Sequence, residues 1–164
     1  MDTYKVTLKM QPFVAAWLRK HYGNPVRFPD RSIESIELRR LTVGRRSASE
    51  EEACRDGLEP VDFALPDCAY HKPSVYHYLN RRGRRTLQSM TDDLFQIDLY
   101  HGIESIVAEG GTLVDAIWTW CRRNDIHPDF TGTIRQRFYR ARESHRSCGV
   151  QLSLAGKVTG RKKS

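Results

Sequence analysis

Cysteine and histidine side chains with the chemistry to bind a metal gather in one stretch of this sequence. Cys68, His71 and His77 have the spacing C-x2-H-x5-H, and Cys54 lies upstream. A structural zinc site needs four ligands, which usually come as Cys or His pairs at tighter, repeated spacing. The sequence contains no second C-x2-C or H-x3-H half. We therefore predict ordinary thiols and imidazoles here, with no metal and no other cofactor.

Groups that could perform catalysis are equally scattered. Cys121 and His127 could meet as a thiol–imidazole pair, but no nearby residue would orient the imidazole. Asp92 and Asp93 are adjacent, so on a helix they point about 100° apart and do not converge as a catalytic dyad does. A glycine-rich phosphate loop is also missing from the sequence. These patterns predict a protein that is not an enzyme.

Positive charge is concentrated at one end of the chain. The 164 residues carry a formal net charge of +7, and residues 111–164 alone contain 11 basic and 4 acidic side chains. Arginine outnumbers lysine by 20 to 7. A guanidinium group binds phosphate through two parallel hydrogen bonds and stays charged, so this bias favours an anionic partner.

The most basic segment is TIRQRFYRARESHR, residues 133–146. It holds five arginines and one carboxylate, Glu143. On a helix that advances about 100° per residue, one edge is apolar and would be buried. That edge comprises Ile134, Phe138, Ala141 and His145. The neighbouring flank holds Arg135, Arg142, Arg146 and Tyr139, and Gln136 lies further round the helix.

The two final helices are expected in helix-turn-helix order. A helix over 112–126, capped by Thr112, is followed by the turn IHPDF and a helix over 131–147. In a helix-turn-helix protein the second helix enters the major groove, where arginine reads guanine and glutamine reads adenine. We predict that the protein binds duplex DNA, in a regulatory or architectural role. The groove-facing residues would be Arg135, Gln136, Tyr139, Arg142 and Arg146.

Two further basic elements would hold phosphates. The stretch RRGRR contains Arg81, Arg82, Arg84 and Arg85 around a glycine that we expect to act as a hinge. The C-terminal GRKKS would add diffuse attraction, as basic arms do.

Three alternatives remain open. The basic face could instead dock an acidic protein partner, or be a helix face that is only solvated. In the third, the strand at 3–10 and the helices at 12–22 and 32–43 follow the order of a ribbon-helix-helix module, in which Lys5, Thr7 and Lys9 would read DNA. Oligomeric state, and DNA as against RNA, are not set by these patterns.

The elements that position these residues predict an α+β, predominantly helical fold. An N-terminal strand–helix–helix portion, 1–66, includes a loop at 45–60, and VDFALP is expected to pair with the first strand. A helical portion, 67–147, holds three helices at 84–100, 112–126 and 131–147, and a flexible basic tail occupies 148–164. The buried face of the 84–100 helix is predicted to be Leu87, Met90, Leu94 and Ile97.

The sequence also predicts the compartment. No apolar run approaches the ~18 residues of a membrane span, and MDTYKVTLKM lacks the apolar core of a signal peptide. Four cysteines without a secretory context are expected to be reduced thiols in the cytoplasm.

The N-terminal stretch TYKVTLKMQPFVAAWLRKHYGNPVRFP resembles the start of small uncharacterised proteins of bacterial phages and integrated mobile elements. The resemblance covers about the first third of the chain, rests on no named motif and transfers no functional residue. It implies a DNA-binding accessory protein.

Overall fold

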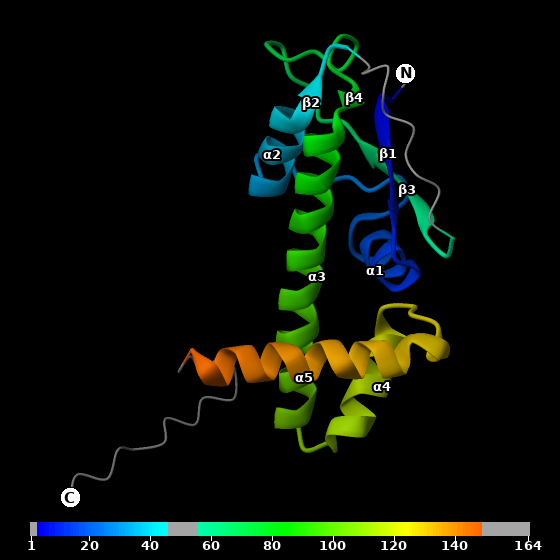
Figure 1. Cartoon of the computed structure of the whole chain (residues 1–164), viewed down its shortest axis with the longest axis vertical. Coiled ribbons are helices and arrows are strands. Elements are labelled where there is room, and N and C mark those ends of the chain that lie inside the picture. Colours follow the sequence, from blue (N-terminus) through cyan, green and yellow to red (C-terminus); the bar gives the residue numbers. More distant parts are fainter. Residues whose placement is uncertain (1–2, 46–55, 149–164) are drawn as a thin grey trace, which may run out of the picture. The chain divides into compact units, whose positions relative to one another are not determined.

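The computed structural model describes residues 3–45 and 56–148 of the chain, which form a mostly helical α+β fold (Figure 1). The described residues contain five α-helices and two small antiparallel two-stranded sheets, and this fold class confirms the prediction. The predicted loop at 45–60 and basic tail at 148–164 lie largely outside the described residues, as does Cys54. None of the described helices is long and apolar enough to cross a membrane.

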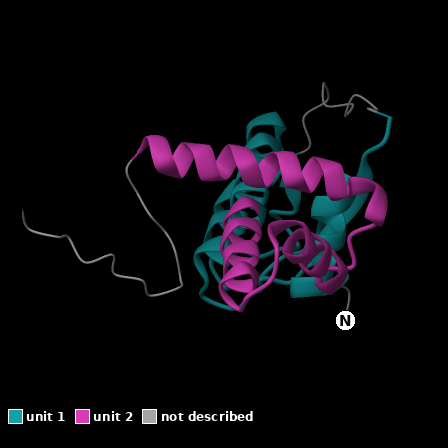
Figure 2. Ribbon diagram, turned by 90° about the horizontal axis from the view of Figure 1, so that it is seen from below, with its two compact units in different colours: residues 1–95 teal, residues 96–164 magenta. Residues whose placement is uncertain are grey.

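The chain divides into two compact units, residues 1–95 and 96–164, which Figure 2 colours separately. The division between residues 95 and 96 falls within one long helix, α3 (Arg81–Ala108). The division of the chain into portions 1–66 and 67–147 stays a prediction.

A two-stranded antiparallel sheet in the first unit joins β1 (Lys5–Met10) to β3 (Glu59–Ala64). Alternate β1 side chains are buried, as the period of two predicts: these are Val6, Leu8 and Met10. Val6 lies opposite Phe63, which is fully buried. The predicted pairing of VDFALP with the N-terminal strand is therefore confirmed.

The outer face of β1 is occupied by contacts within the sheet. Lys5 Nζ donates to Asp62 Oδ2 at 2.7 Å, and Thr7 Oγ1 donates to Asp62 Oδ1 at 2.6 Å. A ribbon-helix-helix strand pairs with its copy in a second chain and leaves its outer side chains for DNA. Here β1 pairs with β3 and two of the three expected readers bind a carboxylate, which favours an internal sheet strand.

The first of the two helices between these strands has the predicted bounds, whereas the second ends two residues before the predicted 43 because Thr42 and Val43 form a strand. In α1 (Pro12–Tyr22), Gly23 adopts φ 86° and donates its N–H to Arg19 O at 3.0 Å, which ends the helix. Before α2 (Ile33–Leu41), Ser32 Oγ accepts the N–H of Ser35 at 3.1 Å as an N-cap. A second small sheet follows, in which β2 (Thr42–Val43) pairs with β4 (Tyr78–Leu79).

α3 is one continuous helix of 28 residues, whereas the sequence predicts a helix over 84–100 only. Gly102 lies within this continuous helix, at the point where Trp120 of the following helix packs against it. A Cβ on Gly102 would lie 2.5 Å from Nε1 of Trp120, so only a residue without a side chain lets the indole approach.

The predicted buried face of α3 is only partly right: Leu87 is fully buried, and Met90 and Leu94 are half-buried. Ile97 is 58% exposed. The buried row instead repeats every four residues: Leu87, Thr91, Phe95, Leu99 and Ile103. A search for apolar residues leaves Thr91 out of this row because its side chain has a hydroxyl group. The hydroxyl can be buried because its Oγ1 donates to Leu87 O at 3.0 Å.

In the second unit, the end of α3 packs with α4 (Leu113–Arg123) and α5 (Thr131–Ser147), as Figure 2 shows. Their shared core contains Leu99, Ile103, Ile117, Trp120, Ile134 and Phe138. Thr112 caps α4 as predicted: its Oγ1 accepts the N–H of Asp115 at 3.2 Å and donates to Asp115 Oδ2 at 2.7 Å.

The connection from α4 to α5 is longer than a typical helix-turn-helix turn of about three or four residues. It runs over the seven residues 124–130 and includes a 3-10 turn, η1 (Pro128–Phe130). Asn124 is buried and its Nδ2 donates to Trp120 O at 2.8 Å, so the start of the connection is held against α4. The helix order matches the DNA-binding motif, while the turn does not.

Candidate nucleic-acid interface

The apolar edge of α5 is buried as the helical wheel predicts. Ile134 and Phe138 are fully buried and Ala141 nearly so. His145 is partly exposed: its ring stacks on Tyr100 with centroids 4.4 Å apart and an interplanar angle of 9°, and its Nδ1 lies 2.6 Å from Ala141 O. Burial of this edge determines which side of α5 is turned toward solvent.

The neighbouring flank of α5 is open to solvent. Arg135 and Arg146 are exposed, Tyr139 is 41% exposed, and Arg142 is partly buried. The guanidinium carbon of Arg135 lies 5.7 Å from the centre of the Tyr139 ring, in cation–π range. The flank therefore presents guanidinium groups beside an exposed aromatic ring.

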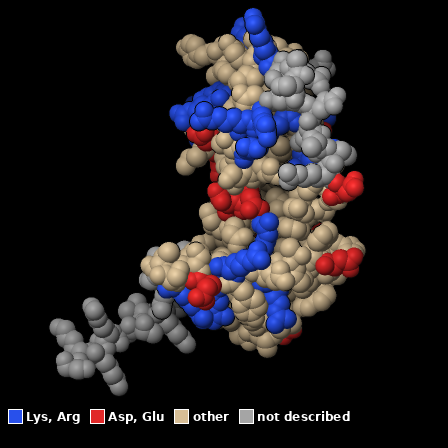
Figure 3. Space-filling view, viewed as in Figure 1, with Lys and Arg blue, Asp and Glu red and all other residues tan. Residues whose placement is uncertain are grey.

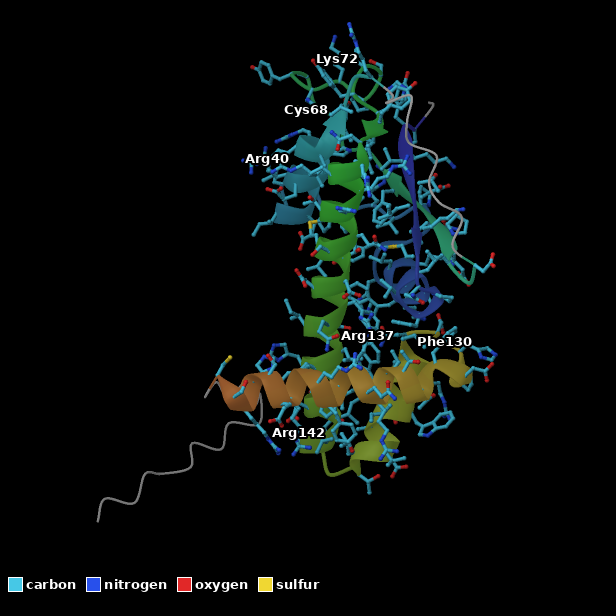
Figure 4. The ribbon with its side chains drawn as sticks, in the orientation of Figure 1. Arg40, Cys68, Lys72, Phe130, Arg137 and Arg142 are labelled. Carbon is cyan, nitrogen blue, oxygen red and sulfur yellow. The ribbon has the colours of Figure 1, made fainter. Side chains whose placement is uncertain are left out.

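The arginines of this flank make no direct ion pair with a carboxylate in the part of the chain that the structure describes. Among the described residues, no salt bridge within 4.0 Å involves Arg135, Arg142 or Arg146. Figure 3 shows Lys and Arg side chains gathered over α5 with an acidic group among them. In Figure 4, Arg137 and Arg142 project from different edges of the helix.

One carboxylate does act on the neighbourhood of the flank. Burial raises the pKa of Tyr100 above its ordinary value, and Glu104 raises it further, while Arg142 and Arg146 lower it. Glu104 and the two arginines thus change the pKa of the Tyr100 hydroxyl in opposite directions.

Gln136 is exposed, but it lies further round α5 than the arginine flank, as the wheel predicts. Arg140, which the sequence prediction did not include, is exposed on the same side as Gln136, and no salt bridge among the described residues involves it. Its position on the wheel could have identified it.

The RRGRR cluster forms the first turns of α3 and is not hinged. A Cβ on Gly83 would lie 3.0 Å from Leu41 O, so the glycine allows α3 to pack closely against the end of α2. Asn80 Oδ1 accepts the Gly83 N–H at 2.7 Å, and Arg84 Nε donates to Leu79 O at 3.3 Å.

Within this cluster, Arg81, Arg82 and Arg85 are exposed and Arg84 is partly exposed. All four belong to the first unit, whereas α5 belongs to the second. We therefore treat the cluster and the α5 flank as separate candidate phosphate contacts.

The cysteines and histidines weighed as metal or catalytic groups make other contacts. His71 Nε2 lies 2.9 Å from Thr42 Oγ1, and His71 stacks on Tyr76. His77 Nδ1 lies 3.1 Å from Pro73 O. Across the described residues, no group of three or more His, Cys, Asp or Glu side chains could hold a metal ion.

Cys121 and His127 lie in different surroundings, one in the core and the other at the surface. Cys121 is buried, and burial raises the pKa of its thiol to about 11. His127 is exposed, with Nδ1 3.3 Å from Asp129 Oδ2. A protonated thiol in the core is a packing group and a poor nucleophile.

No protein-family model, no curated protein and no solved structure matches this chain. The resemblance of its N-terminal third to phage and mobile-element proteins therefore stays a prediction.

Proposed function

We propose that the protein binds double-stranded DNA in the cytoplasm through the exposed flank of α5. Arg135, Arg142 and Arg146 supply guanidinium groups for phosphates and guanine edges, with Tyr139 beside them and Gln136 further round. Arg81, Arg82, Arg84 and Arg85 at the start of α3 are proposed as additional phosphate contacts. A DNA-binding accessory role in a phage or mobile element would suit this activity.

One observation carries the proposal: Arg135 and Arg146 are exposed, Arg142 is partly exposed, and no salt bridge among the described residues involves any of the three. Arg142 and Arg146 lie four residues apart on α5, and like charges at this spacing repel each other unless an anion is present. DNA relieves that repulsion and releases counterions as it does so.

The test is fluorescence anisotropy with a labelled random duplex and the variant Arg135→Ala/Arg142→Ala. Each lost charge-assisted contact is worth about 1.5–3 kcal/mol, so we expect affinity to fall by tenfold or more. Arg40→Ala/Lys72→Ala is the matched control. It removes the same charge from exposed residues of the first unit, both labelled in Figure 4.

Equal losses of affinity in the two double variants would mean that net charge alone attracts DNA. Retained affinity in Arg135→Ala/Arg142→Ala, with unchanged helical circular dichroism, would rule out the α5 flank. The variant Arg82→Ala/Arg85→Ala tests the RRGRR cluster separately.

A second candidate function is docking of an acidic protein partner. Val114 and Trp118 lie one turn apart on α4 and are 51% and 45% exposed. Exposed tryptophan and arginine are typical of protein interfaces. This candidate predicts negligible affinity for duplex DNA at ~150 mM salt, where exposed charges are largely screened.

A further inference from the structure

A pocket of about 520 Å³ lies in the first unit, far along the sequence from α5. Its walls come from α2, from the segment 27–31 before it, and from the end of β3 with residues 65–67. A volume between about 300 and 1,000 Å³ is typical of small-molecule sites. The sequence alone does not reveal this pocket, because its walls come from segments that are distant in the chain.

Part of the lining is apolar and buried. It consists of Phe28, Leu38, Ala64 and Leu65. The Phe28 ring packs against Phe63 and Tyr22, with centroids 5.9 and 5.0 Å away, so this wall is held from behind. Such a wall suits a flat or apolar part of a ligand.

The rest of the lining is strongly polar. Arg27, Arg31 and Arg39 contribute three guanidinium groups, and Asp30 and Asp67 contribute two carboxylates. Among the described residues, no salt bridge within 4.0 Å joins any of these arginines to a carboxylate. The arginines can therefore bind an oxyanion, while the carboxylates can accept hydrogen bonds from hydroxyl or amino groups.

Arg31 has a backbone conformation that L-residues seldom adopt, with φ 63°. A glycine or asparagine would adopt it at lower cost, by about 1 kcal/mol. Strained residues of this kind concentrate at ligand sites. Arg31 lines the pocket, so the arginine at this strained position gives the pocket a guanidinium group that glycine or asparagine would not supply.

We propose that this pocket binds a small phosphorylated molecule of the size and polarity of a nucleoside monophosphate. Arg27, Arg31 and Arg39 hold the phosphate, the carboxylates accept hydrogen bonds from hydroxyl or amino groups, and the apolar wall covers the ring. This site is separate from the proposed DNA-binding flank and does not depend on it.

Isothermal titration calorimetry of the full chain with adenosine monophosphate tests the proposal. Adenosine lacks the phosphate and ribose phosphate lacks the ring, so both should bind at least tenfold more weakly. Saturable binding of adenosine monophosphate at micromolar to low millimolar concentration is expected. Its absence in that range overturns the proposal.

Adjacent residues of α2 provide a matched pair of variants. Arg39 lines the pocket, whereas Arg40 is ion-paired with Glu37 at 2.9 Å and does not line it. Arg39→Gln should weaken binding by about tenfold, the size of one charge-assisted contact, and Arg40→Gln should leave it unchanged. Equal effects of the two variants would mean that the ligand binds elsewhere.

Arg31→Gly separates binding from folding. It removes one guanidinium group and relieves the strained φ, so the variant should unfold at or above the wild-type temperature while binding more weakly. The variant Arg135→Ala/Arg142→Ala tests whether the nucleotide binds to the α5 flank instead of the pocket. If this variant loses nucleotide binding, the pocket proposal is overturned and the DNA proposal is unaffected.

Discussion

The indole of Trp120 lies so close to Gly102 that a Cβ there would be 2.5 Å from Nε1. Gly102 is near the end of α3 and Trp120 is in the core face of α4, so this contact sets how closely the two helices approach. A Cβ on Gly132, in the first turn of α5, would meet no atom within 4 Å apart from its chain neighbours and the backbone of its own helix.

These two glycines allow a matched stability test. Gly102→Ala should destabilise the protein by about 1–3 kcal/mol through overpacking. Gly132→Ala should be neutral or stabilising by under about 1 kcal/mol, because alanine is the better helix former. Thermal unfolding followed by circular dichroism measures both, and equal unfolding temperatures would contradict the close approach.

A second prediction concerns the salt dependence of DNA binding. The logarithm of the affinity should fall linearly with the logarithm of salt concentration, with a slope of about −0.9 per phosphate neutralised. Arg135→Ala/Arg142→Ala should make that slope shallower by about two such increments. Anisotropy titrations at several salt concentrations give the slopes, and a slope that the double variant leaves unchanged would mean that neither arginine contacts a phosphate.

The Asp62 carboxylate should make stability depend on pH in the acid range. The hydrogen bond from Lys5, followed by that from Thr7, holds the pKa of Asp62 below its ordinary 3.8. Its stabilising contribution is therefore present at neutral pH and is lost as the pH falls below 3.8 through the lower folded value. Because both side chains are partly exposed, that contribution is under about 1 kcal/mol.

Asp62→Asn should accordingly lower the free energy of unfolding at pH 7 and leave it nearly unchanged near the acid end of the titration. Urea unfolding at a series of pH values measures the difference. Asp93→Asn, at an exposed position of α3, is the control. A deficit that persists undiminished at low pH would argue against the Asp62 interactions as its source.

The cysteines should differ in their reaction with iodoacetamide. Hydrogen bonds from the backbone of Tyr70 and His71 hold the pKa of Cys68 below its ordinary value, whereas burial raises that of Cys121 to about 11. Cys68 should therefore be alkylated in the folded protein at pH 8, and Cys121 only after unfolding. Peptide mapping by mass spectrometry distinguishes them; rapid labelling of Cys121 in the native state would mean that the core opens.

Local patterns predicted much of the fold. The alternation in β1, the cap at Thr112 and the buried edge of α5 all depend on residues close together in the chain, so local sequence patterns were enough to predict them. The buried face of α3 was predicted only in part because Thr91 hides its hydroxyl in a backbone hydrogen bond. The sequence did not reveal that α3 continues through Gly102, because the close approach of Trp120 is a contact between residues 18 positions apart.

The candidate sites divide in the same way. The arginine flank of α5 lies on one helix, and a helical wheel locates it. The pocket of the first unit depends on how α2, the segment before it and the end of β3 come together, so Arg31 and Asp67 showed no relation in the sequence.

The guanidinium group of Arg135 already rests above the Tyr139 ring before any ligand arrives. A freely rotating arginine side chain has about 2 kcal/mol of rotamer entropy to lose on immobilisation. An arginine that an aromatic neighbour has partly ordered loses less of it on binding. The ring thus acts as a preorganising support, and replacing it with a small side chain should make association entropically more costly even where the charge is retained.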